Sequence, residues 1–212
     1  MKAFLEIEHI DANRNVISLS KQISKSFVMA FPALLVRQFL MNTLIDAKDV
    51  GGATGSKKSN ALESPLYCSS PGGRGAWVAP GCASGGGIVY SDNLGIVIGS
   101  GTAVEKPQDY KLATKIVHGD AAGELIHFGT VVSNLVINAA PTSTGTFDIQ
   151  AIFKNESGGS IDVEEVGVYA MGEPASSTSP MDLFCILRDV ISTVAVADEE
   201  YLRVKYTVQI ST

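Results

Sequence analysis

The segment 202–210 alternates strictly between apolar and polar residues. Its apolar positions are Leu202, Val204, Tyr206, Val208 and Ile210, and the four residues between them are polar. Because successive side chains of a strand point to opposite faces, this pattern predicts a strand with one dry and one wet surface. A half-buried antiparallel sheet is the expected context for such a strand.

Short runs of the same kind fill most of the second half of the chain. We predict strands at 87–90, 94–98, 125–132, 135–138, 146–154, 161–169 and 183–188, in addition to 201–210. Near the N-terminus, 1–8 and 16–19 predict a hairpin. Roughly seven or eight short strands separated by turn residues favour a mainly β fold, an antiparallel β-sandwich of the Ig-like or jelly-roll-like kind.

The apolar spacing changes to a helical one between residues 24 and 45. Phe27, Phe31, Leu35 and Phe39 follow one another at intervals of four residues. This spacing predicts one helix over about 24–45, which packs against the sheet or against a neighbouring subunit. Pro32 either kinks this helix or marks its first turn.

Residues 51–87 are rich in Gly, Ser and Pro and carry no regular apolar pattern. A loop of this length predicts an extended arm that reaches a neighbouring subunit. Trp77 lies within the arm, and it either anchors the arm on another surface or covers the protein's own core. The predicted organisation is therefore 1–50 as N-terminal strands and helix, 51–87 as the arm, and 88–212 as the sandwich, which forms one unit with 1–50.

Composition narrows the choice of partners. The net charge is −6, and only 18% of residues are charged. This balance argues against binding nucleic acid through its phosphates, which needs clustered Lys and Arg. The longest apolar run, 27–36, is too short to span a bilayer, and 1–8 lacks the features of a secretory signal, so no membrane partner is expected. The low charge and the 21 glycines favour a turn-rich protein with large surfaces that partners cover, so we expect it to form oligomers.

Residues capable of catalysis or metal binding are scattered. His9, His118 and His127 are not spaced as metal ligands, and 51–59 lacks the spacing of a phosphate-binding loop. Cys185 lies in an apolar run and is predicted to be a buried free thiol. The sequence does not decide whether Cys68 and Cys82 form a disulfide. We therefore predict no enzyme activity, no metal and no cofactor.

One charged pair is predicted inside the fold. Glu164 and Glu165 are adjacent on a strand and point to opposite faces, so they cannot act together as the two carboxyls of a glycoside hydrolase. Glu165 shares the phase of Val163 and Gly167, which predicts that it points inward. We expect it to pair with Arg188, in the run 183–188.

Several segments within 24–212 together carry a resemblance to a known group of proteins. They are 26–28, 95–103, 109–112, 116–119, 153–158, 161–167 and 188–190. In this order they resemble β-rich structural proteins of tailed-bacteriophage virions. The resemblance implies a multicopy component of a capsid, neck, tail or fibre, located in the virion, whose partners are itself and other virion proteins. It implies no active-site residues.

The function predicted from the sequence is therefore a non-enzymatic virion structural protein. It would assemble through sandwich edges, helix and arm, with Phe27, Phe31, Phe39 and Trp77 as candidate interface residues. The alternative is a carbohydrate- or receptor-binding module, in which Trp77 or Tyr90 stacks on a host-surface glycan.

Overall fold

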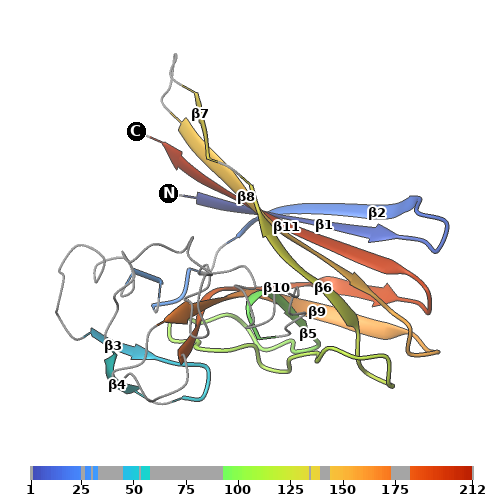
Figure 1. Cartoon of the computed structure of the whole chain (residues 1–212), viewed down its shortest axis with the longest axis horizontal. Coiled ribbons are helices and arrows are strands. Elements are labelled where there is room, and N and C mark those ends of the chain that lie inside the picture. Colours follow the sequence, from blue (N-terminus) through green and yellow to red (C-terminus); the bar gives the residue numbers. More distant parts are fainter. Residues whose placement is uncertain are drawn as a thin grey trace, which may run out of the picture.

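The described part of the chain folds into two antiparallel sheets and a small two-stranded sheet (Figure 1). The computed structural model describes residues 2–24, 27–29, 31–32, 45–52, 54–57, 93–133, 135–138, 144–172 and 182–211. The strands are β1 (Lys2–Ile10), β2 (Val16–Ser24), β3 (Ile45–Lys48), β4 (Thr54–Lys57), β5 (Gly95–Gly99), β6 (Ile126–Val132), β7 (Val136–Asn138), β8 (Thr144–Lys154), β9 (Ile161–Gly172), β10 (Asp182–Val196) and β11 (Tyr201–Ser211). The mainly β, antiparallel fold predicted from the alternating pattern is confirmed.

The larger sheet has the strand order β2-β1-β11-β8-β6, and β7 extends it by pairing with β8. The smaller sheet has the order β10-β9-β5, while β3 and β4 pair only with each other. Buried residues of both sheets belong to one hydrophobic cluster. The N- and C-terminal strands run side by side in the larger sheet (Figure 1).

The alternation along β11 sets which face of the larger sheet is dry. Tyr206 pairs with Leu5 of β1 on one side and with Ile149 of β8 on the other, and all three side chains are buried. Lys205 and Glu6 fall in the next row, on the wet face, with Lys205 Nζ 3.0 Å from a Glu6 carboxylate oxygen. Alternate residues of β11 therefore face the core and the solvent.

The smaller sheet is covered on both faces. All five residues of β5 are buried, as are Val166 and Val168 of β9. The larger sheet covers one face, and the loop 100–118 covers the other with the buried side chains of Leu112 and Ile116. This two-sided burial explains why residues 166–172 of β9 form a run without charged residues.

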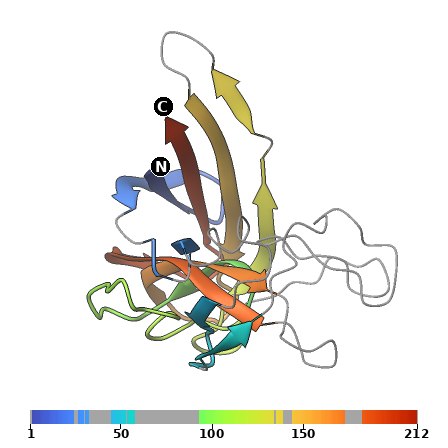
Figure 2. The same cartoon turned by 90° about the vertical axis from the view of Figure 1, so that its left-hand side faces the viewer.

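One end of the larger sheet projects beyond the smaller sheet, as Figures 1 and 2 show. Ile210 is in phase with the buried residues of β11, yet it is 49% exposed. Ile210 pairs with Gly145 of β8, and Gly145 pairs with Ile137 of β7, so the three residues form one row on the same face. Ile137 is 70% exposed, so the dry face of the sheet continues past the core that covers it.

The helix predicted over about 24–45 is not confirmed. Ser24 is the last residue of β2, Phe27 forms a bridge with Leu187 of β10, and Ile45 begins β3. Of the described residues in this range, only Phe31 and Pro32 are helical, and residues 25–26, 30 and 33–44 lie outside the described residues. The rings of Phe27 and Phe31 pack against the core, and their centroids are 4.7 Å apart.

The first part of the arm predicted at 51–87 contains a strand. Thr54–Lys57 forms β4, which pairs with β3 over four residue pairs. The rest of the arm from 58 to 87, with Trp77, lies outside the described residues, as does the strand predicted at 87–90.

Candidate functional site

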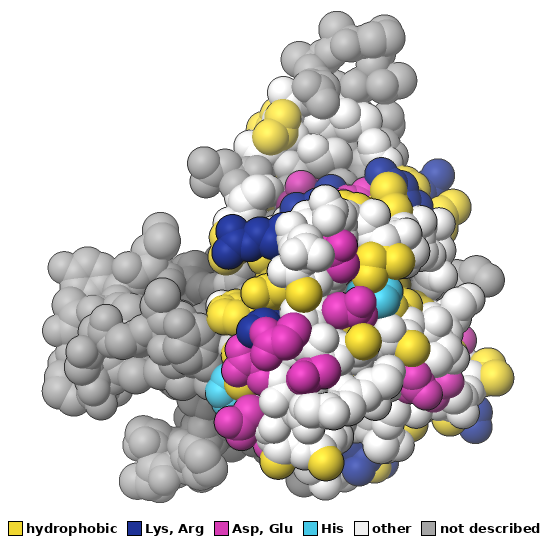
Figure 3. All heavy atoms as spheres, turned by 90° about the vertical axis from the view of Figure 1, so that its right-hand side faces the viewer, with side chains coloured by type: hydrophobic (Ala, Val, Ile, Leu, Met, Phe, Trp, Pro, Cys, Tyr) yellow, Lys and Arg dark blue, Asp and Glu magenta, His cyan; other side chains and the backbone are white. Residues whose placement is uncertain are grey.

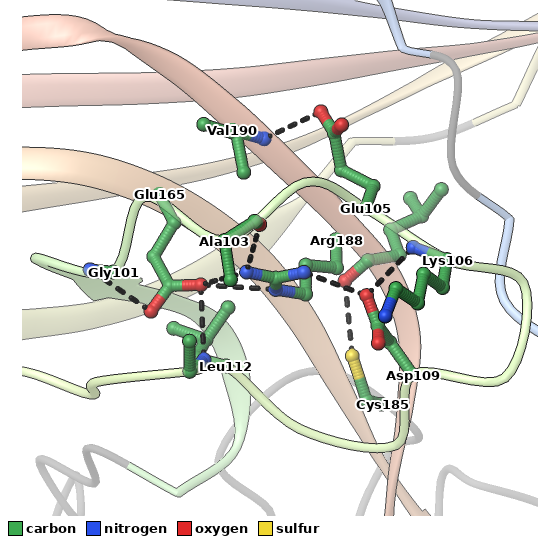
Figure 4. Close-up of polar contacts among 12 residues, drawn as sticks. Gly101, Ala103, Glu105, Lys106, Asp109, Leu112, Glu165, Cys185, Arg188 and Val190 are labelled. Atoms are coloured by element: carbon green, nitrogen blue, oxygen red, sulfur yellow. Dashed lines mark hydrogen bonds and ion pairs between the residues drawn. The ribbon is translucent and has the colours of Figure 1, made fainter.

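A buried ion pair joins two adjacent strands of the smaller sheet. Glu165 of β9 has no exposed surface, and the Arg188 side chain of β10 is 2% exposed. Arg188 Nε donates to Glu165 Oε2 at 2.9 Å, and a second guanidinium nitrogen lies 2.9 Å from the same oxygen (Figure 4). The structure therefore forms the contact that the strand phase of Glu165 predicted.

Arg188 also holds the loop 100–118. Its Nη1 lies 2.6 Å from Asp109 Oδ2, and its Nη2 donates to the carbonyl oxygen of Ala103 at 2.8 Å. Burial disfavours the charged guanidinium, but hydrogen bonds to Asp109 and Glu165 outweigh this effect and raise the pKa of Arg188. Asp109 is the member of this network that strand periodicity could not identify, because it lies in a loop.

The remaining acceptor sites of Glu165 bind backbone N–H groups of the same loop. Glu165 Oε1 accepts from Thr114 at 2.7 Å and from Gly101 at 3.2 Å, and Oε2 accepts from Ala113 at 3.0 Å. A buried carboxylate is tolerated only when it is paired and hydrogen-bonded, and both conditions are met here. The network thus fixes the path of the loop over the smaller sheet.

The close approach of the loop requires glycine at position 101. A Cβ on Gly101 would lie 2.6 Å from Ala113 Cβ and would collide with Glu165 Oε1. We predict that Gly101→Ala destabilises the protein by about 1–3 kcal/mol, because an extra methyl group must push the loop off the carboxylate. Urea unfolding followed by circular dichroism measures this change.

Gly159 is the matched control for this substitution. It is exposed, and a Cβ placed on it meets nothing within 4 Å. Gly159→Ala should change the free energy of unfolding by no more than about 0.5 kcal/mol. Equal effects at positions 101 and 159 would contradict the packing argument.

A second buried carboxylate, Asp189, connects the two sheets. It accepts hydrogen bonds from the Ser24 hydroxyl of β2 at 2.7 Å and from the Tyr206 hydroxyl of β11 at 3.0 Å. Burial, followed by the proximity of Asp189, raises the pKa of Tyr206 well above its ordinary value. Arg188 and Asp189 are adjacent residues of β10. Arg188 binds the loop 100–118, and Asp189 binds the larger sheet.

The chemistry available to this cluster is limited by access. Glu165 is fully enclosed and its oxygens are occupied by the donors described above. An open pocket of about 190 Å³ lies beside Arg188, and its lining includes Lys106, Asp109 and Tyr110. The Lys48 ammonium sits 4.0 Å from the centre of the Tyr110 ring. The arrangement supports positioning of the loop, and we assign no reaction to it.

Two of the histidines lie close together in the described part of the chain. His118 and His127 lie close together, with ring centroids 5.8 Å apart, and His118 Nδ1 accepts from the backbone N–H of His127 at 3.0 Å. Within the described ranges, no cluster of three or more His, Cys, Asp or Glu is arranged to hold a metal ion. Cys185 is a buried free thiol, as predicted, and burial raises its pKa.

The four predicted interface residues divide into two groups. Phe27 and Phe31 are partly buried against the core cluster, so much of each ring serves the protein's own packing. Phe39 and Trp77 lie outside the described residues, and Tyr90 of the alternative glycan-binding prediction does so too. The structure therefore does not bring the four residues together into one described site.

Two surfaces of the larger sheet expose apolar side chains instead. The first is the projecting face, formed by Val132, Leu135, Ile137 and Ile210, which are 39–70% exposed. The second is the β2 edge, formed by Val16, Ile17, Leu19 and Ile23, which are 51–59% exposed. The sequence analysis predicted assembly through sandwich edges but identified the residues of neither surface, since an exposed apolar residue and a buried one give the same sequence signal.

The wet face of the larger sheet, by contrast, is organised by charge pairs. Lys21 Nζ lies 2.6 Å from one oxygen of Glu6, and Lys205 binds the other oxygen. The hydrogen bonds from Lys21 and Lys205 lower the pKa of Glu6. Acidic side chains also gather on the side of the molecule that carries the β8–β9 and β10–β11 turns (Figure 3), in keeping with the net negative charge.

Comparisons of the chain with protein-family models, with curated proteins and with solved structures found no match. No helix in the described part of the chain is long and apolar enough to cross a membrane.

Proposed function

We propose that this chain is a non-enzymatic structural protein of a tailed-bacteriophage virion, which assembles in multiple copies and with other virion proteins. We infer in addition that its two sheets form a sandwich of the Ig-like or jelly-roll-like kind. The sequence segments that resemble such virion proteins support the proposal. The observation that carries it is the projecting face, where the dry side of the larger sheet extends past the core.

The physical argument rests on the exposed apolar area. Each Å² of apolar surface removed from water contributes roughly 25 cal/mol, so uncovered apolar side chains favour association. Val132, Ile137 and Ile210 belong to three different strands, which makes the surface a continuous sheet face rather than scattered residues. A neighbouring subunit packed on this face would complete the core that the smaller sheet leaves unfinished.

The test compares two equally drastic surface substitutions. Ile137→Lys places a charge on the projecting face, whereas Val104→Lys places one on the loop 100–118, where Val104 is 75% exposed. We expect the native protein and Val104→Lys to form the same multicopy species in native mass measurements. Ile137→Lys should need at least about tenfold more protein to assemble, equivalent to about 1.4 kcal/mol per contact.

A protein that stays monomeric at every concentration would overturn the proposal. Equal loss of assembly in both variants would overturn the role of the projecting face. The glycan-binding alternative predicts saccharide binding by such a monomer, and no described residue favours it.

A further inference from the structure

Two of the three histidines lie in one row across the larger sheet. His127 of β6 pairs with Phe153 of β8, which pairs with Leu202 of β11. Leu202 in turn pairs with His9 of β1. His127 is 2% exposed, so an imidazole, a group that changes its charge near neutral pH, lies inside the fold at this end of the row.

A β-bulge turns His127 into the core. The register between β6 and β8 shifts between His127 and Thr130, and Gly129 within this shift has a φ of 82°. Strict alternation would place His127 and Thr130 on opposite faces of β6, yet both are buried. Because a bulge re-aims the side chains of its strand, the one at Gly129 explains how the imidazole comes to face Phe153.

The third histidine holds a neighbouring loop against β6. His118 Nδ1 accepts a hydrogen bond from the backbone N–H of His127 at 3.0 Å, and the two ring centroids are 5.8 Å apart. Beside this contact, the Leu125 N–H donates to the Val117 carbonyl at 3.2 Å. His118 and His127, which we call the histidine pair, thereby fasten the loop 117–125 to the start of β6.

The closed loop favours uncharged imidazoles. A ring nitrogen that accepts a hydrogen bond carries no proton, so the proton of a neutral His118 is on Nε2. A second proton would bind Nδ1, where it would face the N–H group of His127 in place of a hydrogen bond. A proton on His127 would create a charge in a buried position next to the Phe153 ring, which burial disfavours.

The charged groups on the surrounding elements are of two kinds. Asp120 and Glu124 are carboxylates on the loop itself, and Glu124 accepts from the Ala121 N–H at 3.3 Å. Charged groups on the other elements form polar contacts there: Lys115 with Asn93, Lys154 with Glu156 and Glu199, His9 with Glu200, and Arg203 with Glu8. Carboxylates ordinarily titrate near about pH 4, so a change between about pH 7 and 5 reports on histidine.

We infer that the histidine pair is a pH-sensitive switch, which releases the loop 117–125 from β6 as the pH falls from about 7 to 5. The open loop takes up protons that the closed loop excludes, so acid shifts the equilibrium toward opening. Opening uncovers Leu125, which has no exposed surface in the closed loop. The inference adds a regulatory response to the chain and does not rest on the proposed assembly.

The size of the response follows from proton binding. An unperturbed imidazole titrates near about pH 6.5, so each histidine that is kept uncharged only in the closed loop raises the opening equilibrium about thirtyfold between about pH 7.5 and 5. His9 gives the contrast. Its Nε2 lies 2.7 Å from a carboxylate oxygen of Glu200, so a proton on His9 strengthens that contact.

Hydrogen exchange of the full chain, followed by mass spectrometry, measures the opening. Protection factors corrected for the intrinsic effect of pH are compared at about pH 7.5, at about pH 5 and after return to the first pH. We expect the protection of 117–127 to fall at least about tenfold in acid and to recover afterwards. The protection of 161–169 in β9 should change less than about twofold.

Three variants separate the histidine pair from His9. His118→Asn offers an amide oxygen to the same backbone N–H without titrating, and the exposed position tolerates the change. His127→Phe removes the buried titratable ring. Each of these two variants should reduce the acid response at least about threefold. His9→Gln can still donate to Glu200 and should respond as the native chain does.

An unchanged protection of 117–127 in acid would overturn the inference. A full response in His118→Asn would overturn it too, because the acid would then act on another group. Equal losses in 117–127 and 161–169 would indicate general unfolding and not a switch. If His127→Phe fails to fold, His118→Asn and His9→Gln decide the outcome. Native mass measurements of assembly are a separate readout, so a monomer that shows the switch would overturn only the proposed function.

Discussion

Removing either partner of the Glu165–Arg188 pair should lower the free energy of unfolding by about 3–5 kcal/mol, because it leaves the other charge buried without compensation. The two side chains are 0% and 2% exposed, so water cannot replace the lost partner. In a chain of this size the corresponding fall in Tm is about 6–20 °C. Glu165→Ala, Arg188→Ala and the double variant, unfolded in urea, form the cycle that measures their coupling.

The double variant should cost less than the sum of the single variants by about 1–3 kcal/mol. Asp109→Ala is the internal control. Its carboxylate is nearer to Arg188, at 2.6 Å against 2.9 Å, but its side chain is 22% exposed. We therefore expect a smaller loss for Asp109→Ala than for Glu165→Ala. Additive single effects would show that the two groups act separately, and a larger loss at Asp109 would show that distance matters more than burial.

Phe153→Ala should also destabilise the protein by about 3–5 kcal/mol, because it opens a cavity in the core. Phe153 of β8 is 1% exposed and lies between Leu202 of β11 and His127 of β6 in the strand register. Its ring meets the His127 ring edge to face, with centroids 4.8 Å apart. Differential scanning calorimetry and urea unfolding both report the loss.

The neighbouring residue provides the comparison for Phe153. Ile152 lies on the opposite face of β8, where it is partly exposed and pairs with Arg203. Ile152→Ala should cost clearly less than Phe153→Ala, since water already reaches the side chain. Similar losses at the two positions would mean that the wet and dry faces of the larger sheet are assigned wrongly.

Strand alternation predicted most of the described sheet. The predicted strand at 161–169 corresponds to β9, and the one at 201–210 corresponds to β11, within three residues at either end. The phase of Glu165 followed from the same rule. The prediction of β11 succeeds because this strand has one face against the core, and such burial leaves a period of two in the sequence.

Features that depend on distant residues left no such signal. Asp109 and Arg188 are 79 residues apart in the sequence, and the loop around Asp109 has no regular pattern of apolar and polar residues. The pattern 16–19 predicted only the start of β2, because Lys21 stands where the alternation of apolar and polar residues would place an apolar one. Phe27 and Phe31 have helical spacing, but their burial is decided by contact with β10, and tertiary packing overrides local spacing.

The position of β11 between β1 and β8 has a consequence for biosynthesis. β1 pairs with β11 from Lys2–Gln209 to Ile10–Tyr201, so partners 191 to 207 residues apart must meet before the middle of the larger sheet exists. On the ribosome, the β1–β2 hairpin emerges early and must wait with its dry side chains uncovered until translation reaches Tyr201. Such non-local pairing slows folding, and nascent chains that stall before that point would expose Leu5 and Ile149 to chaperones and proteases.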